Sequence, residues 1–346
     1  MGTWKVTNKI LGLILIGLSG VACSEVAFTP APIEQAQQGP IDNGNERTDT
    51  FYFNAERPPS KVDVLFIVDN SGSMAEEQAR LSTALSSFVD TLADLDWQIG
   101  ITTTDLSGGA QSTNGDVVTM VGTGVKVLNK RVPNYEQVFL DTVLAHGTTP
   151  ECAQNNTNCA SGDEQALGAA RLAVTKRNTT NYGFFRANSD FIAIALTDED
   201  ERSNGGNGAT TPTQLISTVN SAWGLTKLFS GYGIIVRPGD TACINAQAAS
   251  GGRPATFVQQ LADMTDGVTG SICDTDYGPA LANIGTRVRR YATSIMLSDV
   301  PVAGTVQVTL TPANPSITWI VVGQTVRLSD LPARGTRVDV TYERAP

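Results

Sequence analysis

The stretch Lys61-Val62-Asp63-Val64-Leu65-Phe66-Ile67-Val68-Asp69-Asn70-Ser71-Gly72-Ser73-Met74 decides the fold of this chain. Its apolar part has the look of a strand buried in a parallel sheet. Asp69, Ser71 and Ser73 follow that strand, so one carboxylate and two hydroxyls reach the carboxyl end of the sheet. Ligands usually bind at this edge of an open α/β sheet. Hard oxygen ligands on a short loop suit Mg²⁺, Mn²⁺ or Ca²⁺ rather than Zn²⁺.

The pattern from residue 51 to residue 291 alternates strands and helices, which predicts an α/β domain with a doubly wound, mainly parallel sheet. The expected strands are residues 62–69, 97–104, 191–197, 232–237 and 271–274, with a glycine-broken β segment at 117–128. The expected helices are residues 74–95, 133–145, 164–175, 213–223, 255–264 and 277–291.

The texture changes after Ala292, where short alternating strands are separated by Pro and Gly. Residues 292–346 therefore predict a small antiparallel β module, sandwich-like or a meander. Its expected strands are residues 294–297, 305–310, 317–322, 325–328 and 337–342. A unit of this size is marginal alone, so we expect it to pack on the larger domain.

Residues 1–22 read as a secretory signal, with a basic start, an uncharged apolar stretch and small residues before Cys23. The ending resembles a bacterial lipoprotein signal, which implies that Cys23 is lipidated. Ser24 is not the Asp that favours inner-membrane retention in Gram-negative sorting, so it points to the outer membrane, facing the periplasm or the cell surface. The alternative is ordinary cleavage near Ala22, with Cys23 incidental. Residues 23–50 are rich in Pro and polar residues without a period, which predicts a flexible tether.

The composition describes a globular protein, with 346 residues, 41% hydrophobic and 17% charged. The net charge of −10 provides no electrostatic footprint for nucleic acid. Besides Cys23 there are four cysteines, which allow three pairings. We favour Cys152–Cys159 and Cys243–Cys273, since disulfides suit a compartment outside the cytoplasm. A zinc site is disfavoured because the chain has no Cys-x₂-Cys pair and a single His.

The Asp-x-Ser-x-Ser pattern at Asp69, Ser71 and Ser73 resembles the metal ion-dependent adhesion site (MIDAS) of von Willebrand factor type A domains. The alternative is an Asx-turn followed by a helix N-cap. The resemblance also implies an Asp after a Thr at the end of a later strand, matched by Thr197-Asp198. That Asp often contacts the metal through water.

The resemblance further implies a hydroxyl from a second loop, five and six residues before a small-apolar pair. Counting back from Ala166-Leu167 gives Ser161. Glu164 is an alternative ligand, and Thr148 or Thr149 a weaker one. Ser161 and Glu164 also have the spacing of a helix capping box.

The family usually has Gly after this Asp, but here Glu199-Asp200-Glu201 follows Asp198. These carboxylates bind a second cation, favour Ca²⁺, or form a solvated acidic loop.

Residues 51–346 as a whole resemble a narrower group, the bacterial lipoproteins with a type A domain. Besides residues 61–74, the carriers are Asp163-Glu164-Gln165, Asp198-Glu199-Asp200, Ser271-Ile272-Cys273-Asp274-Thr275-Asp276-Tyr277 and the pattern Trp319, Leu328, Pro332, Gly335, Val338 and Tyr342.

The expected function is a membrane-tethered, cation-dependent adhesion module without enzymatic activity. Because hydroxyl ligands are neutral, the bound cation keeps part of its positive charge, and one coordination position stays open. A carboxylate of a protein or peptide partner can fill that position. One alternative is a Mg²⁺-dependent phosphotransferase-like enzyme with Asp69 as nucleophile, although Ser71 stands where such enzymes usually have a second acid. Another is a structural envelope component with a stabilising ion.

Overall fold

The structure is a computed structural model that describes residues 38–53, 61–155, 158–202, 206–224, 227–292, 294–330, 332–333 and 335–345. The predicted signal and Cys23 lie outside these ranges. Within them, no helix combines the length and the apolar character needed to cross a membrane.

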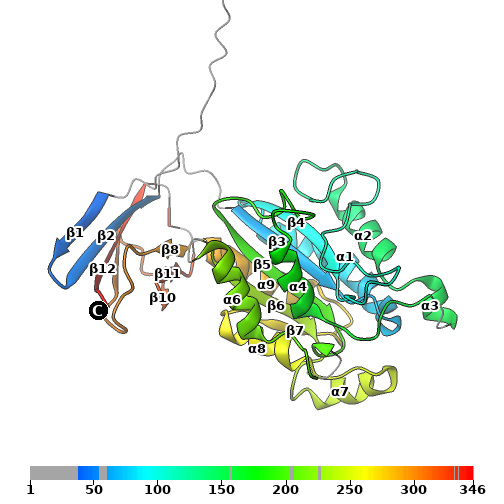
Figure 1. The fold of residues 1–346 in the computed structure, drawn as a ribbon. Helices are drawn as coiled ribbons and strands as arrows, with labels where there is room; N and C mark the ends of the chain where they lie inside the picture. The colour runs from blue at the N-terminus through cyan, green and yellow to red at the C-terminus, as the bar shows by residue number, and fades with distance from the viewer. Residues whose placement is uncertain are drawn as a thin grey trace, which may run out of the picture.

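The larger part of the molecule is built on a five-stranded parallel sheet, as the alternation of strands and helices predicted (Figure 1). Its strand order is β4-β3-β5-β6-β7. The strands are β3 (Lys61–Val68), β4 (Asp96–Thr103), β5 (Ser189–Thr197), β6 (Phe229–Ile235) and β7 (Thr269–Ser271). The central strand β3 pairs with β4 on one side and with β5 on the other.

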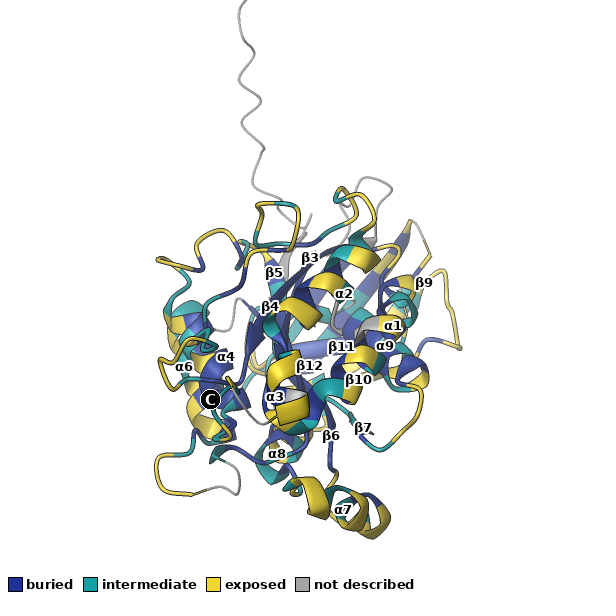
Figure 2. Ribbon diagram, turned by 90° about the vertical axis from the view of Figure 1, so that its right-hand side faces the viewer, coloured by how far each residue is buried: buried dark blue, intermediate teal, exposed yellow. Residues whose placement is uncertain are grey.

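Helices cover both faces of this sheet, because side chains alternate along its buried strands. Val64 and Phe66 of β3 pack in one apolar core, and Leu65 and Ile67 pack in the other. The first core is closed by α1 (Ala75–Thr91), α2 (Tyr135–His146) and α9 (Gly278–Ala292). The second is closed by α4 (Ala166–Thr175), α6 (Pro212–Trp223) and α8 (Thr256–Met264). Figure 2 shows the dark, buried strands between these helices.

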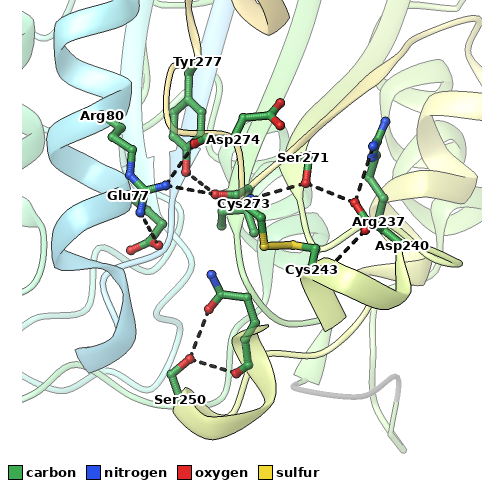
Figure 3. The surroundings of a disulfide bond; sticks show 12 residues. Glu77, Arg80, Arg237, Asp240, Cys243, Ser250, Ser271, Cys273, Asp274 and Tyr277 are labelled. Atoms are coloured by element: carbon green, nitrogen blue, oxygen red, sulfur yellow. Dashed lines mark hydrogen bonds and ion pairs between the residues drawn. A yellow bond between two sulfur atoms is a disulfide. The ribbon is translucent and has the colours of Figure 1, made fainter. Parts of the chain in front are cut away.

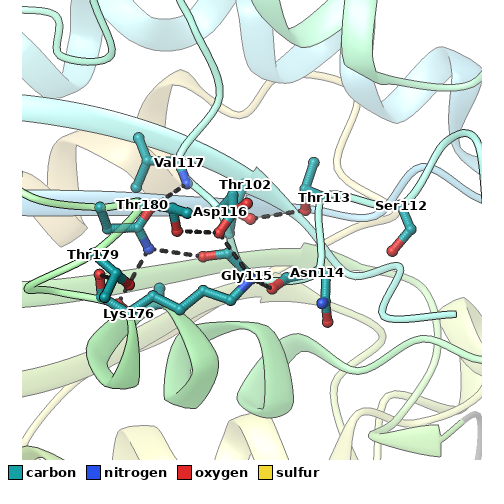
Figure 4. A network of polar contacts seen from close by, with 12 residues as sticks. Thr102, Ser112, Thr113, Asn114, Gly115, Asp116, Val117, Lys176, Thr179 and Thr180 are labelled. Carbon is teal, nitrogen blue, oxygen red and sulfur yellow. Dashed lines mark hydrogen bonds and ion pairs between the residues drawn. The ribbon is translucent and has the colours of Figure 1, made fainter. Parts of the chain in front are cut away.

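Two short helices, α3 (Pro150–Asn155) and α7 (Thr241–Gln247), were missed by the sequence analysis. The β segment predicted at residues 117–128 is wrong. Gly122 and Gly124 have positive φ angles in a turn, and a single bridge joins Leu128 to Ile99 of β4. Polar contacts hold the chain just before this segment. The carboxylate of Asp116 forms an ion pair at 2.8 Å with Lys176, the residue that follows α4 (Figure 4).

The remaining strands form a β module of two antiparallel sheets. One sheet has the order β1-β2-β12-β9, with β1 (Gln38–Asn43), β2 (Glu46–Phe53), β12 (Thr336–Glu343) and β9 (Gln307–Thr311). The other has the order β10-β11-β8, with β10 (Trp319–Val322), β11 (Thr325–Leu328) and β8 (Ser294–Met296). Their shared apolar core includes Phe51, Ile295, Val326 and Val340.

The five strands predicted after Ala292 are therefore present, but the tether predicted for residues 23–50 is wrong from Gln38 onward. Strand β2 pairs along its whole length with β12 near the end of the chain. Asp49 of β2 is fully buried and accepts hydrogen bonds from Ser298 and from the hydroxyl of Tyr342, at 2.7 and 2.8 Å. The parallel-sheet domain is thus inserted between β2 and β8 of the module.

The β module adjoins the amino ends of the parallel strands. It connects to the start of β3 and to the end of α9, and Arg327 of β11 binds Asp266, which precedes β7, at 2.9 Å. Figure 1 shows α3 and α7 at the opposite end of the molecule. The carboxyl edge of the parallel sheet is therefore not covered by the module.

Candidate metal centre

The predicted ligands on β3 and β5 lie at the carboxyl ends of two neighbouring strands. The chain leaves β3 for β4 on one side and later returns to β5 on the other side, so the strand order reverses between β3 and β5. The amide of Asp69 donates to the carbonyl of Leu196 at 2.9 Å, which joins the two strand ends directly.

Asp69 is fully buried, and both of its carboxylate oxygens accept hydrogen bonds. One accepts from the amide of Ser71 at 2.8 Å, and the other accepts from the hydroxyl of Thr197 at 2.9 Å. The hydrogen bond from the Ser71 amide forms the Asx-turn that was the alternative to a metal site. This bond orients the carboxylate and does not exclude its role as a ligand. Burial raises the pKa of Asp69 from 3.8 to about 6, against the effect of the Ser71 and Thr197 hydrogen bonds.

Asp198 differs from Asp69 in that its buried carboxylate accepts no hydrogen bond from the described residues. It is 1% exposed, and neither carboxylate oxygen has a hydrogen-bond partner among the described residues. Burial raises the pKa of Asp198 from 3.8 to about 7, the charge of Asp69 adds to the shift, and the Ser73 hydroxyl opposes it. The hydroxyls of Ser73 and Ser71 lie 3.1 Å apart. Asp198 thus has two buried carboxylate oxygens that accept no hydrogen bond, and the site also contains two serine hydroxyls. Such a set of oxygen ligands fits a hard divalent cation.

The second loop buries the side chain of Glu164 and leaves Ser161 partly exposed. The hydroxyl of Ser161 accepts from the amide of Asp163 at 3.2 Å, and helix α4 begins only at Ala166, so the predicted capping box is wrong. Glu164 is 2% exposed. Burial is the main cause, and the charge of Asp69 the next, of a rise in the pKa of Glu164 from 4.5 to about 10. The charge of Asp69 thus acts on Glu164, and both Glu164 and Ser161 stay predictions for the second-loop ligand.

Two of the three acidic residues after Asp198 have structural partners. Asp200 accepts from the amide of Phe257 at 2.9 Å, in the first turn of α8. Glu201 accepts from the amides of Leu167 and Gly168 at 2.8 and 2.9 Å, in the first turn of α4. Carboxylates at helix N-termini satisfy free amides and the helix dipole. Because both side chains are buried and hydrogen-bonded, the interpretation as a solvated loop is wrong for these two residues, while a second cation and a preference for Ca²⁺ stay predictions.

A brace behind the Ser71–Ser73 loop was missed by the sequence analysis. Gln78 of α1 is buried and donates to the carbonyl of Asp69 at 2.6 Å. The amide of Thr148 donates to the side chain of Gln78 at 2.9 Å, and the Thr148 hydroxyl donates to the carbonyl of Ser71. Thr148 is thus a brace, not the weaker ligand considered above. The available signal was Gln78 itself, a polar residue on the apolar stripe of a helix.

Other buried polar atoms at the same edge also have no partner in the part of the chain that the structure describes. They are the side-chain oxygen of Asn70, directly after β3, and the hydroxyl of Thr104, directly after β4. Sequence reasoning did not single out either residue. No group of three or more His, Cys, Asp and Glu side chains in the described ranges is arranged to hold a metal ion. A cation here would therefore need the serine hydroxyls together with the carboxylates.

Both predicted disulfides are present, and both lie at this edge. Cys152 of α3 pairs with Cys159, and Cys243 of α7 pairs with Cys273 after β7. Figure 3 shows the second disulfide beside Arg80 of α1. The Arg80 guanidinium donates to the carbonyl of Asp274 at 3.0 Å.

The sequence matches no protein-family model and no curated protein. Solved structures with some likeness include the pilus adhesin SpaC from Lactobacillus rhamnosus GG in its open conformation (12% identity, TM-score 0.41, 86% of this chain and 40% of that one). Others are proximal thread matrix protein 1 from the mussel byssus (14%, 0.38, 70% and 50%) and the pilus adhesin RrgA from Streptococcus pneumoniae (12%, 0.33, 87% and 59%). This chain thus spans less than two thirds of each, and at these TM-scores the likenesses carry no argument.

Proposed function

We propose that this protein is a cation-dependent binding module of the MIDAS type, with Mg²⁺, Mn²⁺ or Ca²⁺ held by Asp69, Ser71, Ser73 and Asp198. Glu164 or Ser161 completes the set. The observation that carries the proposal is the pair of buried Asp198 oxygens, neither of which has a hydrogen-bond partner within the described ranges. The open coordination place takes a carboxylate of a protein or peptide partner, as the sequence resemblance implies.

The charges at the site support a cation. Burial raises the pKa values of Asp69 and Asp198 to about 6 and about 7, and no Lys or Arg forms an ion pair with either in the described ranges. A divalent ion would offset the repulsion between these carboxylates at neutral pH. Ligation by neutral hydroxyls would leave it enough positive charge to attract an acidic partner.

The sheet topology supports the same position. We infer a doubly wound sheet of the type A class from the order β4-β3-β5-β6-β7 with helices on both faces. Ligands of such sheets bind where the strand order reverses, outside the carboxyl ends of the strands. Asp69 and Asp198 follow the two strands at that point.

The β module, whose first strand follows the proposed membrane anchor in the chain, lies toward the opposite end of the molecule from the proposed cation site. We propose that Cys23 is lipidated and holds the protein at the outer membrane. Strand β1, the first described element, belongs to the β module. The module adjoins the amino edge of the parallel sheet, so an anchor attached there would leave the carboxyl edge accessible to a partner. No enzymatic activity is proposed, because Ser71 stands where the phosphotransferase pattern has its second acid.

Calorimetric titration of the purified protein with Mg²⁺, Mn²⁺ and Ca²⁺ tests the cation site. We expect saturable binding that Asp69→Ala abolishes. Asp274→Ala is the matched control, because it removes an exposed carboxylate from the same edge and should leave cation binding unchanged. Equal binding by the wild type and Asp69→Ala would show that the cation site is wrong.

Capture of envelope proteins on the immobilised protein tests the binding function. Partners released by EDTA and not captured by Asp69→Ala would support the adhesion proposal. Cation binding without any such partner would favour an ion that only stabilises an envelope component. Phosphatase turnover that Asp69→Asn removes would favour an enzyme instead.

A further inference from the structure

Gly72 lies between the two serines of the candidate site and packs directly against the Cys152–Cys159 disulfide. A Cβ atom placed on Gly72 would lie 3.2 Å from Sγ of Cys152 and 3.9 Å from Sγ of Cys159. The first distance is tighter than ordinary van der Waals contact, so the sulfur atoms leave little room behind this residue. The disulfide therefore limits where the Ser71–Ser73 backbone can lie.

The segment that leads into the disulfide also holds the loop by hydrogen bonds. The Thr148 hydroxyl donates to the carbonyl of Ser71. One residue further on, the Thr149 hydroxyl accepts from the amide of Cys152 at 3.1 Å. Residues 148–152 thus reach the ligand loop by two routes, a contact of the Cys152 sulfur at Gly72 and a hydrogen bond from Thr148 to Ser71.

We propose that the Cys152–Cys159 disulfide positions the Ser71–Ser73 loop for the cation, so that opening it by a dithiol weakens cation binding. This inference rests on the proposed function and adds a means of regulating the same site. Metal affinity depends on groups that orient the ligands as well as on the ligands themselves. Two hydroxyls on a short loop are especially dependent on such support, because neither carries a charge that would draw it to the ion.

The exchange step needs only a dithiol. A thiolate of the dithiol attacks Sγ of Cys159, which is half-buried, while Cys152 is 4% exposed. The protein S–S bond breaks, Cys152 leaves as a thiolate that takes up a proton, and a mixed disulfide forms at Cys159. The second thiol of the reagent then attacks the mixed disulfide and releases Cys159. The protein gains two electrons and two protons, and the dithiol becomes a disulfide.

The second disulfide provides a matched control. Cys243–Cys273 joins α7 to the segment after β7 (Figure 3). Its hydrogen-bonding neighbours are Asp240 and Ser271, and no contact recorded for the described residues links it to residues 71–73. Opening this bond removes one cross-link of the same kind from the same edge without releasing the ligand loop.

The test compares Cys152→Ser/Cys159→Ser with Cys243→Ser/Cys273→Ser by Mn²⁺ calorimetry and by amide hydrogen exchange of residues 70–74. For the first variant we expect about tenfold weaker Mn²⁺ binding, in line with the effect of other groups that orient ligands. Its loop amides should also exchange faster. For the second variant we expect wild-type affinity and wild-type exchange of the loop. Wild-type protein treated with a dithiol should follow the first variant.

Unchanged Mn²⁺ affinity and unchanged exchange in Cys152→Ser/Cys159→Ser would overturn the inference while leaving the proposed function intact. If the oxidised wild type binds no cation, the proposed function and this inference both fail. Should the double serine variant not fold, Gly72→Ala in the oxidised protein replaces it. The added methyl group crowds Sγ of Cys152, so weaker Mn²⁺ binding supports the inference and unchanged binding contradicts it.

Discussion

Strand β3 carries two fully buried aspartates, Asp63 near its start and Asp69 just past its end, and their surroundings differ in charge. At the amino edge, Asp63 binds the Arg186 guanidinium at 2.7 Å and accepts from the Arg186 amide at 2.8 Å. It also accepts from the Ser189 hydroxyl, and the buried Lys227 ammonium lies 3.7 Å away. The protein itself provides the cations that balance this carboxylate.

At the carboxyl edge, no Lys or Arg of the described residues pairs with Asp69, and its negative charge raises the pKa of the neighbouring Asp198. Its hydrogen-bond donors, the Ser71 amide and the Thr197 hydroxyl, are neutral. Buried charges are normally paired or bound to a metal. A cation from outside the chain that balances the carboxyl edge, as we propose, accounts for this difference.

The largest expected effect is at the amino edge. Asp63→Ala should lower the free energy of unfolding by about 3–5 kcal/mol, because it removes the carboxylate that faces the buried Lys227 ammonium and one of the two carboxylates paired with Arg186. Urea denaturation should show the same loss in EDTA and in a divalent cation. Asp96→Ala is the control, since that partner of Arg186 is 42% exposed and should cost less than about 1 kcal/mol. If the loss of stability in Asp63→Ala differed between EDTA and a divalent cation, the two edges would not differ in the way proposed.

A change of opposite sign is expected for Asp198→Asn in EDTA. Burial raises the pKa of Asp198 in the folded protein from 3.8 to about 7, so the folded state holds this proton more tightly than the unfolded chain. Stability therefore falls as the pH rises through this range, and the penalty is complete above about pH 7. At pH 8 the neutral amide should stabilise the protein by on the order of 2 kcal/mol. Destabilisation in EDTA would mean that Asp198 is already balanced.

Cation affinity should depend on pH because protons compete for the same carboxylates. Burial raises the pKa values of Asp198 and Asp69 to about 7 and about 6. Mn²⁺ binding should therefore be about tenfold weaker at pH 6 than at pH 8. Calorimetry at both values measures this change, and affinity that does not vary between them would rule out buried carboxylates as the ligands.

The smallest effect is expected for the brace behind the ligand loop. Thr148→Val removes the hydroxyl that donates to the Ser71 carbonyl, so it should cost about 1 kcal/mol of stability. Cation binding should weaken by a few-fold. Thr83→Val makes the same chemical change at an exposed position of α1 and should alter neither quantity. If both variants behave alike in calorimetry, Thr148 does not support the site.

The parts of the fold predicted from the sequence are those with a local signal. The apolar run before Asp69 and the run before Asp198 each mark a buried strand and its end, so the two acids could be placed at one edge. Both disulfides followed from cysteine spacing and the expected compartment. Gln78 had a signal that was overlooked, since it interrupts an apolar stripe.

The parts that were missed depend on contacts between distant residues. Strand β2 lies between β1 and β12, with Phe51 opposite Val338 of β12, and no pattern within residues 23–50 reveals β12 as a partner. Asp200 and Glu201 looked like free acids, since the helix N-termini that they cap belong to other segments. Local sequence identifies an acidic side chain but not the amides that it will meet.

The most direct test of the central claim is the free energy of unfolding with and without a divalent cation, measured on the wild type, Asp69→Ala and Asp63→Ala. The account predicts that a cation at one hundred times its dissociation constant stabilises the wild type by about 2.7 kcal/mol. The cation should stabilise Asp63→Ala by the same amount, although this variant is less stable without it, and it should not stabilise Asp69→Ala. Equal stabilisation of the wild type and Asp69→Ala, or none in the wild type, would contradict the claim that an external cation balances the carboxyl edge.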